Sequence, residues 1–155
     1  MNDEAVLQKL SELGIELPPT PKAVAAYLPL RRADHLVFLA GQVPLVEGQV
    51  LHPGRLGEDV SVAQGVEAAR RAGVQLLAAL RGGLGSFELV RQVVQLSVFV
   101  AATPAFREHP TVANGASELL AEVLGEPGEH ARAAVGVASL PLGASVEVAA
   151  TVLVA

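Results

Sequence analysis

Residues 144–154 alternate with a period of two, and this pattern constrains the fold more than any other part of the sequence. One face of the segment carries only apolar residues: Val146, Val148, Ala150, Val152 and Val154. The other face carries a mixed set: Glu147, Ala149, Thr151 and Leu153. Successive side chains of a β-strand point to opposite faces. The segment is therefore predicted to be a strand with its valine face on a core.

Glu147 places a carboxylate in the middle of this strand, on a face that is otherwise mostly apolar. A charge in such a place lowers stability unless it is exposed, paired or functional. The pattern alone favours an edge strand with Glu147 in solvent. A functional carboxylate is the alternative.

The N-terminal part of the chain predicts a helix, a linker and a hairpin. Residues 3–13 have helical spacing, with Asp3 as the N-cap and Gly14 as the stop. Residues 18–21 read Pro-Pro-Thr-Pro, a stiff linker. Residues 23–31 and 35–40 are predicted strands joined by a turn at 33–34, and residues 43–58 hold enough Gly and Pro to be an irregular loop.

The rest of the chain predicts two helices and three strands. Ser61 and Gln64 form a capping-box pattern at the start of a long helix that is expected to end at Gly82-Gly83. A strand is predicted at 91–100, a helix at about 111–124, and strands at 132–139 and 144–154. The inner face of the strand at 91–100 is expected to hold four residues: Val94, Leu96, Val98 and Val100.

These elements follow one another as β-β-α-β-α-β-β, behind an N-terminal helix. Two helices against one mixed sheet indicate an α+β fold, a two-layer sandwich. A length of 155 residues suits one domain. We expect an N-terminal helical extension and Pro-rich linker over residues 1–22, and a single domain over residues 23–155.

Apolar residues make up 51% of the chain and charged residues 17%, yet no apolar run is long enough for a membrane helix. The apolar excess predicts a subunit interface on the second face of the strands at 91–100 and 144–154. The start of the chain, Met-Asn-Asp-Glu, is acidic where a signal peptide is basic. We expect a cytoplasmic homo-oligomer.

Several chemistries are disfavoured by composition. The chain has no cysteine, and its four histidines show no metal-ligand spacing. A net charge of −5 without a basic stripe argues against nucleic-acid binding. No Gly-x-Ser-x-Gly motif exists and no serine stands next to a histidine, so a serine nucleophile is not expected. Neither a metal nor an organic cofactor is predicted.

Three polar residues are candidates for a site, each with a structural alternative. Arg132 stands among small apolar residues, and its guanidinium could bind the planar carboxylate of a ligand. The structural alternatives are an ion pair within the protein or a solvated strand end. Tyr27, the single tyrosine, lies in a predicted strand and fits simple core packing. Asn114 falls in the first turn of the second helix, where it fits a cap.

Two blocks of the sequence resemble signatures of the RidA (YjgF-like) family. Residues 38–44, Phe-Leu-Ala-Gly-Gln-Val-Pro, resemble the family's strand end of a small residue, Gly-Gln, an apolar residue and Pro. Residues 131–148 resemble its C-terminal signature, with Arg132, a Leu-Pro pair and Glu147 at the matching distances. Tyr27 stands where the family has a tyrosine. The match spans residues 23–154.

The resemblance implies a chorismate-mutase-like fold, in which a homotrimer forms a central barrel with ligand clefts between subunits. It also implies cofactor-free hydrolysis of reactive enamines and imines, such as 2-aminoacrylate, to 2-oxoacids and ammonia. Arg132 would bind the substrate carboxylate, Glu147 would activate water, and Tyr27 would line the pocket. Phe99, Asn114 and the backbone groups near Ala134 would also contribute to the pocket.

The chain departs from the family pattern in ways typical of a longer branch. His130 replaces a usual proline, Ala149 replaces a frequent second acidic residue, and the N-terminus and the 45–58 loop are longer. A trimer that binds small carboxylates without catalysis is the alternative function. Endoribonuclease activity, a label that many family members carry, is disfavoured by the acidic charge.

Overall fold

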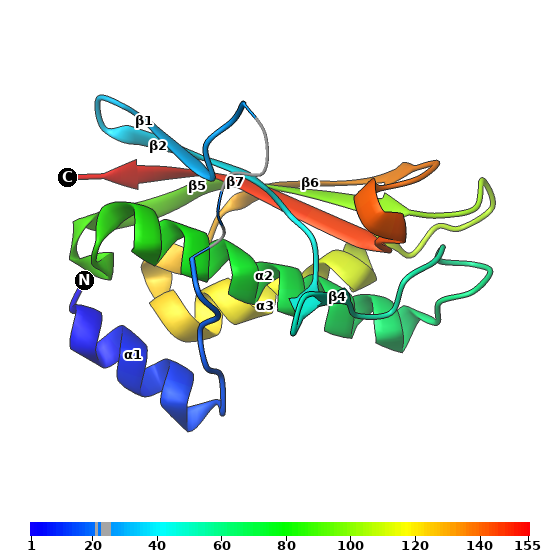
Figure 1. Ribbon diagram of the computed structural model, residues 1–155, viewed down its shortest axis with the longest axis horizontal. Helices are drawn as coiled ribbons and strands as arrows, with labels where there is room; N and C mark the ends of the chain where they lie inside the picture. Colours follow the sequence, from blue (N-terminus) through cyan, green and yellow to red (C-terminus); the bar gives the residue numbers. More distant parts are fainter. Residues whose placement is uncertain (21, 23–25) are drawn as a thin grey trace.

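The computed structural model describes residues 1–20, 22 and 26–155. Its main sheet has the order β1-β2-β7-β5-β6 and consists of β1 (Leu30–Ala33), β2 (Leu36–Gln42), β7 (Val146–Val154), β5 (Val90–Ala101) and β6 (Ala131–Val137). Among the described strand pairs of this sheet, β5–β6 is parallel and the others are antiparallel. Helices α2 (Val62–Leu84) and α3 (His109–Leu124) cover one face of the sheet, and α1 (Asp3–Glu12) lies beyond them (Figure 1). The α+β sandwich and the mixed sheet are confirmed.

Strand β7 lies in the middle of the sheet, paired with β2 on one side and β5 on the other. Its valine face is buried against the helices as predicted. The edge-strand interpretation of Glu147 is therefore wrong. The interpretation failed because alternation shows which face of a strand is buried but not how many neighbours the strand has.

Helix α2 begins at the predicted capping box, where Ser61 Oγ accepts from Gln64 N and Gln64 Oε1 accepts from Ser61 N. The helix does not end at Gly82-Gly83 but at Gly85, which has a φ of 81°. Gly82 and Gly83 instead make room for other segments. A Cβ at Gly82 would lie 2.0 Å from Thr20 Oγ1, and one at Gly83 would lie 2.8 Å from a methyl group of Leu30.

The N-terminal helix α1 packs Val6 and Leu10 into the core. Its N-cap is Asn2, whose Oδ1 accepts from two backbone amides of the first turn, so the prediction of Asp3 as the cap is wrong. Asp3 accepts from Arg81 and from the backbone amide of Phe87. The carboxylate thus fastens the extension to the end of α2 and to the short 3-10 helix η1 (Phe87–Leu89).

Several further details differ from the predictions. Of the predicted strand at 23–31, residues 23–25 lie outside the described residues, 26–29 are not in a strand, and β1 starts at Leu30. The 43–58 loop contains a small hairpin, β3 (Leu45–Val46) and β4 (Gln49–Val50). Two short 3-10 helices, η2 (Glu126–Gly128) and η3 (Pro141–Gly143), precede β6 and β7. Val94 is exposed, because the register shifts between Val93 and Gln95.

The face of the sheet opposite the helices is open in the single chain (Figure 1). The exposed large apolar side chains of this face include Leu36, Phe38, Val135 and Leu153. Below, "the open face" means this side of the five strands. Within the described part of the chain, no helix has the length and apolar character needed to cross a membrane.

Candidate functional site

Glu147 lies near the start of β7 on the open face, directly opposite Phe99 of β5. The side chain is half-buried, and this burial raises the pKa of its carboxyl above the ordinary value. In the described part of the chain, the carboxylate makes neither a hydrogen bond nor an ion pair with a side chain. A carboxyl in this setting can hold or release a proton closer to neutral pH than an ordinary glutamate can.

Gly41 of β2 lies against this carboxylate. A Cβ at Gly41 would lie 2.7 Å from Glu147 Oε1 and 2.8 Å from its Cδ, too close for any side chain. The register between β2 and β7 shifts between Leu39 and Gln42, so the Gly-Gln segment of the sequence forms a local irregularity here. The sequence block at 38–44 therefore provides the backbone against which the Glu147 carboxylate packs.

Arg132 lies at the start of the edge strand β6, in register with Leu96 on the helix-covered side of the sheet. Its guanidinium donates to Asn114 Oδ1 at 2.9 Å, to Ser117 Oγ at 3.0 Å and to the Pro110 carbonyl at 3.4 Å, all in α3. No carboxylate of the described residues is within ion-pair distance of it, so the ion-pair alternative is wrong. The guanidinium has five N–H groups, and in the described part of the chain its Nε–H makes no hydrogen bond, which leaves it available to a ligand.

Asn114 does not cap a helix. Helix α3 begins at His109, which puts Asn114 beyond the first turn, and its Oδ1 accepts from Arg132. The sequence interpretation failed because the helix starts two residues earlier than predicted, with Pro110 at its first turn.

Ser117 and His130 form a pair that sequence reasoning missed. Ser117 Oγ is 3.0 Å from His130 Nε2, and His130 Nδ1 is 2.6 Å from the Gly128 carbonyl. A carbonyl only accepts, so Nδ1 carries the proton of a neutral ring and Nε2 accepts from the Ser117 hydroxyl. Ser117 Oγ in turn accepts from Arg132. The signal was the histidine in place of the family's proline.

The predicted site residues fall into two groups in one chain. Arg132, Asn114 and the neighbouring Ala134 lie on the helix side of β6 and in α3, whereas Glu147 and Phe99 lie on the open face. Tyr27 lies before the start of β1 and belongs to neither group. Its side chain is 51% exposed, so the core-packing alternative for it is wrong. A single chain does not bring Arg132 and Glu147 together.

Comparison with known proteins identifies the family. A family model described as "YjgF/chorismate_mutase-like, putative endoribonuclease" matches residues 8–152. The chain belongs to the YjgF/chorismate mutase-like family. This finding confirms the resemblance to the RidA proteins, because a solved RidA from the Antarctic bacterium Psychrobacter sp. PAMC 21119 superposes with a TM-score of 0.56 at 25% identity, covering 86% of this chain and 93% of that one.

Two relatives are more similar. The structure of protein Atu1372 from Agrobacterium tumefaciens, whose function is unknown, superposes with a TM-score of 0.93 at 43% identity, covering 99% of this chain and 94% of that one. "Protein TCP17" of Trypanosoma cruzi is 40% identical over 148 residues, covering 95% of this chain and 92% of the relative. The YjgF/RidA fold is thus shown over almost the whole chain.

Proposed function

We propose that this YjgF/RidA-family protein hydrolyses small carboxylate-bearing imines and enamines, such as 2-aminoacrylate, to 2-oxoacids and ammonia. The observation that carries the proposal is Glu147, a half-buried carboxyl on a central strand, which has a raised pKa and no ion-pair partner among the described residues. Unpaired carboxyls of this kind are unfavourable for stability, and they are typical of sites that handle protons.

Arg132 supplies the anchor for the substrate. Asn114 and Ser117 hold its guanidinium in place, and its remaining N–H groups donate to the substrate carboxylate. A fixed carboxylate orients the imine carbon for attack, which lowers the entropic part of the barrier. Phe99, Tyr27 and the backbone near Ala134 line the cleft.

Glu147 moves the proton. The methylene carbon of 2-aminoacrylate first takes a proton from solvent, which gives the protonated imine. Water then adds to the imine carbon, and Glu147 accepts the proton that the water loses. The carbinolamine nitrogen then takes that proton from Glu147 and leaves as ammonia when the C–N bond breaks. Loss of the hydroxyl proton forms the new carbonyl. The overall reaction consumes one water and needs neither an oxidant nor a reductant.

The site is completed between subunits of a homotrimer. The open face carries exposed Leu36, Phe38, Val135 and Leu153, an apolar surface that favours burial against other subunits. Because Arg132 and Glu147 lie on opposite sides of the sheet in one chain, they meet when the β6 edge of one subunit approaches the open face of the next.

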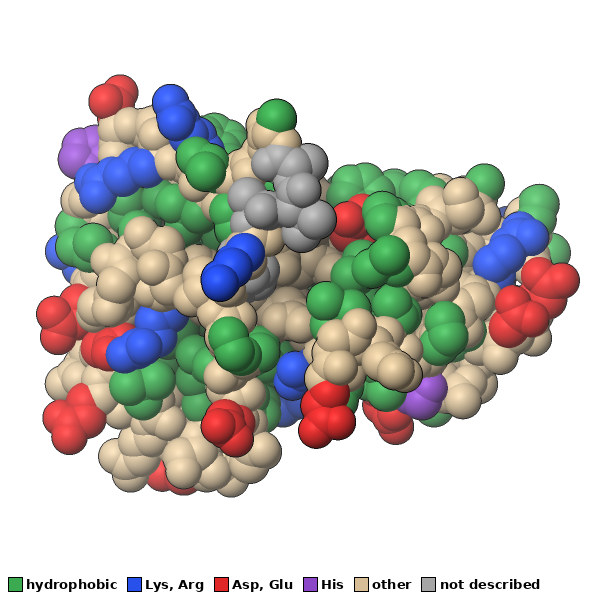
Figure 2. All heavy atoms as spheres, viewed as in Figure 1, with side chains coloured by type: hydrophobic (Ala, Val, Ile, Leu, Met, Phe, Trp, Pro, Cys, Tyr) green, Lys and Arg blue, Asp and Glu red, His purple; other side chains and the backbone are tan. Residues whose placement is uncertain are grey.

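A trimer that binds small carboxylates without catalysis is the second candidate, because the anchored Arg132 fits either role. An endoribonuclease is disfavoured. The net charge is −5, and Figure 2 shows acidic and basic side chains interspersed, without a continuous basic stripe on the face drawn.

Deamination of 2-aminoacrylate, generated in situ from serine by a dehydratase, tests the proposal. The wild-type protein is expected to speed the loss of 2-aminoacrylate, and Arg132→Ala is expected to abolish this effect without dissociating the oligomer. Arg91→Ala is the matched control, since Arg91 is exposed and its guanidinium donates to the backbone carbonyl of Glu88. Binding of 2-oxoacids without any acceleration would support the second candidate instead.

A further inference from the structure

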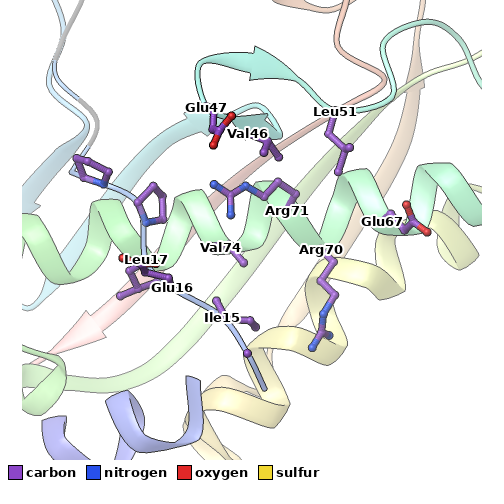
Figure 3. A pocket seen from close by; sticks show the side chains of 13 residues that line it. Ile15, Glu16, Leu17, Val46, Glu47, Leu51, Glu67, Arg70, Arg71 and Val74 are labelled. Carbon is purple, nitrogen blue, oxygen red and sulfur yellow. The ribbon is translucent and has the colours of Figure 1, made fainter. Parts of the chain in front are cut away.

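A cavity of about 710 Å³ lies on the helix side of the molecule and shares no residue with the Arg132 and Glu147 groups (Figure 3). Three segments line it: residues 14–19 after α1, the β3–β4 hairpin with Leu51, and α2 between Glu67 and Val74. Two of these segments are the N-terminus and the loop that exceed the family pattern. The cavity is therefore built partly from the segments in which this sequence departs from the family pattern.

The cavity has the size and walls of a small-molecule site. Its volume falls in the range of pockets that bind metabolites. Its apolar lining consists of Ile15, Leu17, Pro18, Pro19, Val46, Leu51 and Val74. This lining can bind the apolar part of a ligand, but it does not distinguish between charged and uncharged ligands.

Arg71 is the cation of the cavity whose terminal N–H groups are available to a ligand. Its Nε donates to the Leu45 carbonyl, which also accepts from Gln75 Nε2 at 3.2 Å, so the guanidinium is fixed between α2 and the hairpin. Within the described residues, its two terminal nitrogens make no hydrogen bond and meet no carboxylate at ion-pair distance. The neighbouring Arg70 is instead paired with Glu122 at 2.8 Å.

Glu47 supplies a matching negative charge. It stands in the turn of the β3–β4 hairpin, and Figure 3 shows its carboxylate on the same side of the cavity as the Arg71 guanidinium. The two groups form no ion pair with each other. Glu67, by contrast, is bonded to His52 at 2.7 Å. Within the described residues, the cavity thus presents the Arg71 guanidinium and two carboxylates that form no ion pair, Glu47 beside Arg71 and Glu16 elsewhere in the lining, next to an apolar wall.

We propose that this cavity binds an apolar α-amino acid, a zwitterion with both charges on one carbon. The amino acid carboxylate accepts from the terminal nitrogens of Arg71, its ammonium donates to Glu47, and its side chain packs on Leu17 and Val74. Charge-assisted hydrogen bonds at both ends select a zwitterion over either single ion. The proposal does not depend on the deaminase function.

Calorimetric titration of the full-length protein with three probes tests the proposal. L-phenylalanine is expected to bind about tenfold or more tightly than N-acetyl-L-phenylalanine, which lacks the ammonium, and than 2-phenylethylamine, which lacks the carboxylate. Equal affinity for all three probes, or no binding of L-phenylalanine at millimolar concentration, would overturn the proposal.

Variants locate the site. Glu47→Gln is expected to weaken L-phenylalanine about tenfold while leaving N-acetyl-L-phenylalanine unchanged. Glu67→Gln is the matched control and is expected to change neither, because Glu67 is already paired with His52. Arg71→Gln is expected to abolish binding of both L-phenylalanine and N-acetyl-L-phenylalanine, because both carry the carboxylate. A thermal melt shows whether this variant folds. Equal effects of Glu47→Gln and Glu67→Gln would contradict the assigned geometry.

Discussion

The carboxylate of Glu147 rests on the backbone of Gly41, so closely that a Cβ at Gly41 would lie 2.7 Å from Oε1. The two residues come from the two sequence blocks that carry the family resemblance. Gly41 does not have a positive φ, so an alanine fits the backbone there and fails only by collision with Glu147. The position of the glycine is thus explained by the placement of the carboxylate.

Gly41→Ala is expected to displace the Glu147 carboxylate and to lower the rate of imine hydrolysis about tenfold or more. Overpacking of this size lowers the free energy of unfolding by about 1–3 kcal/mol. The double variant Gly41→Ala/Glu147→Ala is the control: without the glutamate side chain, the alanine is expected to have little effect on stability. An equal loss of stability in both backgrounds would show that Gly41 does not act through Glu147.

Glu147→Gln is expected to stabilise the protein at neutral pH. Burial raises the pKa of Glu147 above its ordinary value of 4.5, so the folded state binds its proton more tightly than the unfolded state. The free energy of unfolding therefore falls as pH rises from 4.5 through the folded pKa. Thermal melts should show a higher midpoint for Glu147→Gln at neutral pH and no difference below 4.5. A destabilised variant at neutral pH would contradict the unpaired state of this carboxyl.

Asp3→Asn is expected to loosen the N-terminal extension. The hydrogen bond from Arg81 lowers the pKa of the Asp3 carboxyl below its ordinary value of 3.8. Its stabilisation is therefore present above 3.8 and is lost as pH falls through the lowered folded pKa. Urea titration at neutral pH should show a loss of about 1 kcal/mol. Glu4→Gln, also in the first turn of α1, is the control and should lose less; equal losses would refute the role of Asp3.

Ser117→Ala is expected to raise the KM for an imino acid about threefold to tenfold and to change kcat less, because Ser117 positions Arg132 and touches no reacting atom. His130→Ala should act in the same direction through the loss of its bond to Ser117. Ser139→Ala, at an exposed serine, serves as the control. A fall in kcat without a change in KM would contradict a positioning role.

Local patterns in the sequence predicted local structure well. The alternation of β7 and the capping box at Ser61 involve neighbours a few residues apart, and both are confirmed. Long-range contacts decided the points that failed. Gly82 and Gly83 look like a helix stop but accommodate Thr20 and Leu30, and Val94 faces outward because of a register shift against β7.

The candidate site shows the same division. Arg132 and Glu147 stood out as charges among apolar residues, but which side of the sheet each occupies follows from strand pairing, which no single segment encodes. The Ser117–His130 pair joins residues thirteen positions apart on different elements. Adjacency in the sequence could not reveal it.

Mixing two inactive variants tests the central claim most directly. If each site combines Arg132 of one subunit with Glu147 of the next, trimers assembled from equal amounts of Arg132→Ala and Glu147→Gln contain some sites with both residues intact. Random assembly predicts that about one quarter of the wild-type rate of 2-aminoacrylate hydrolysis returns. A mixture that stays inactive, although the two variants assemble together, would contradict a site shared between subunits.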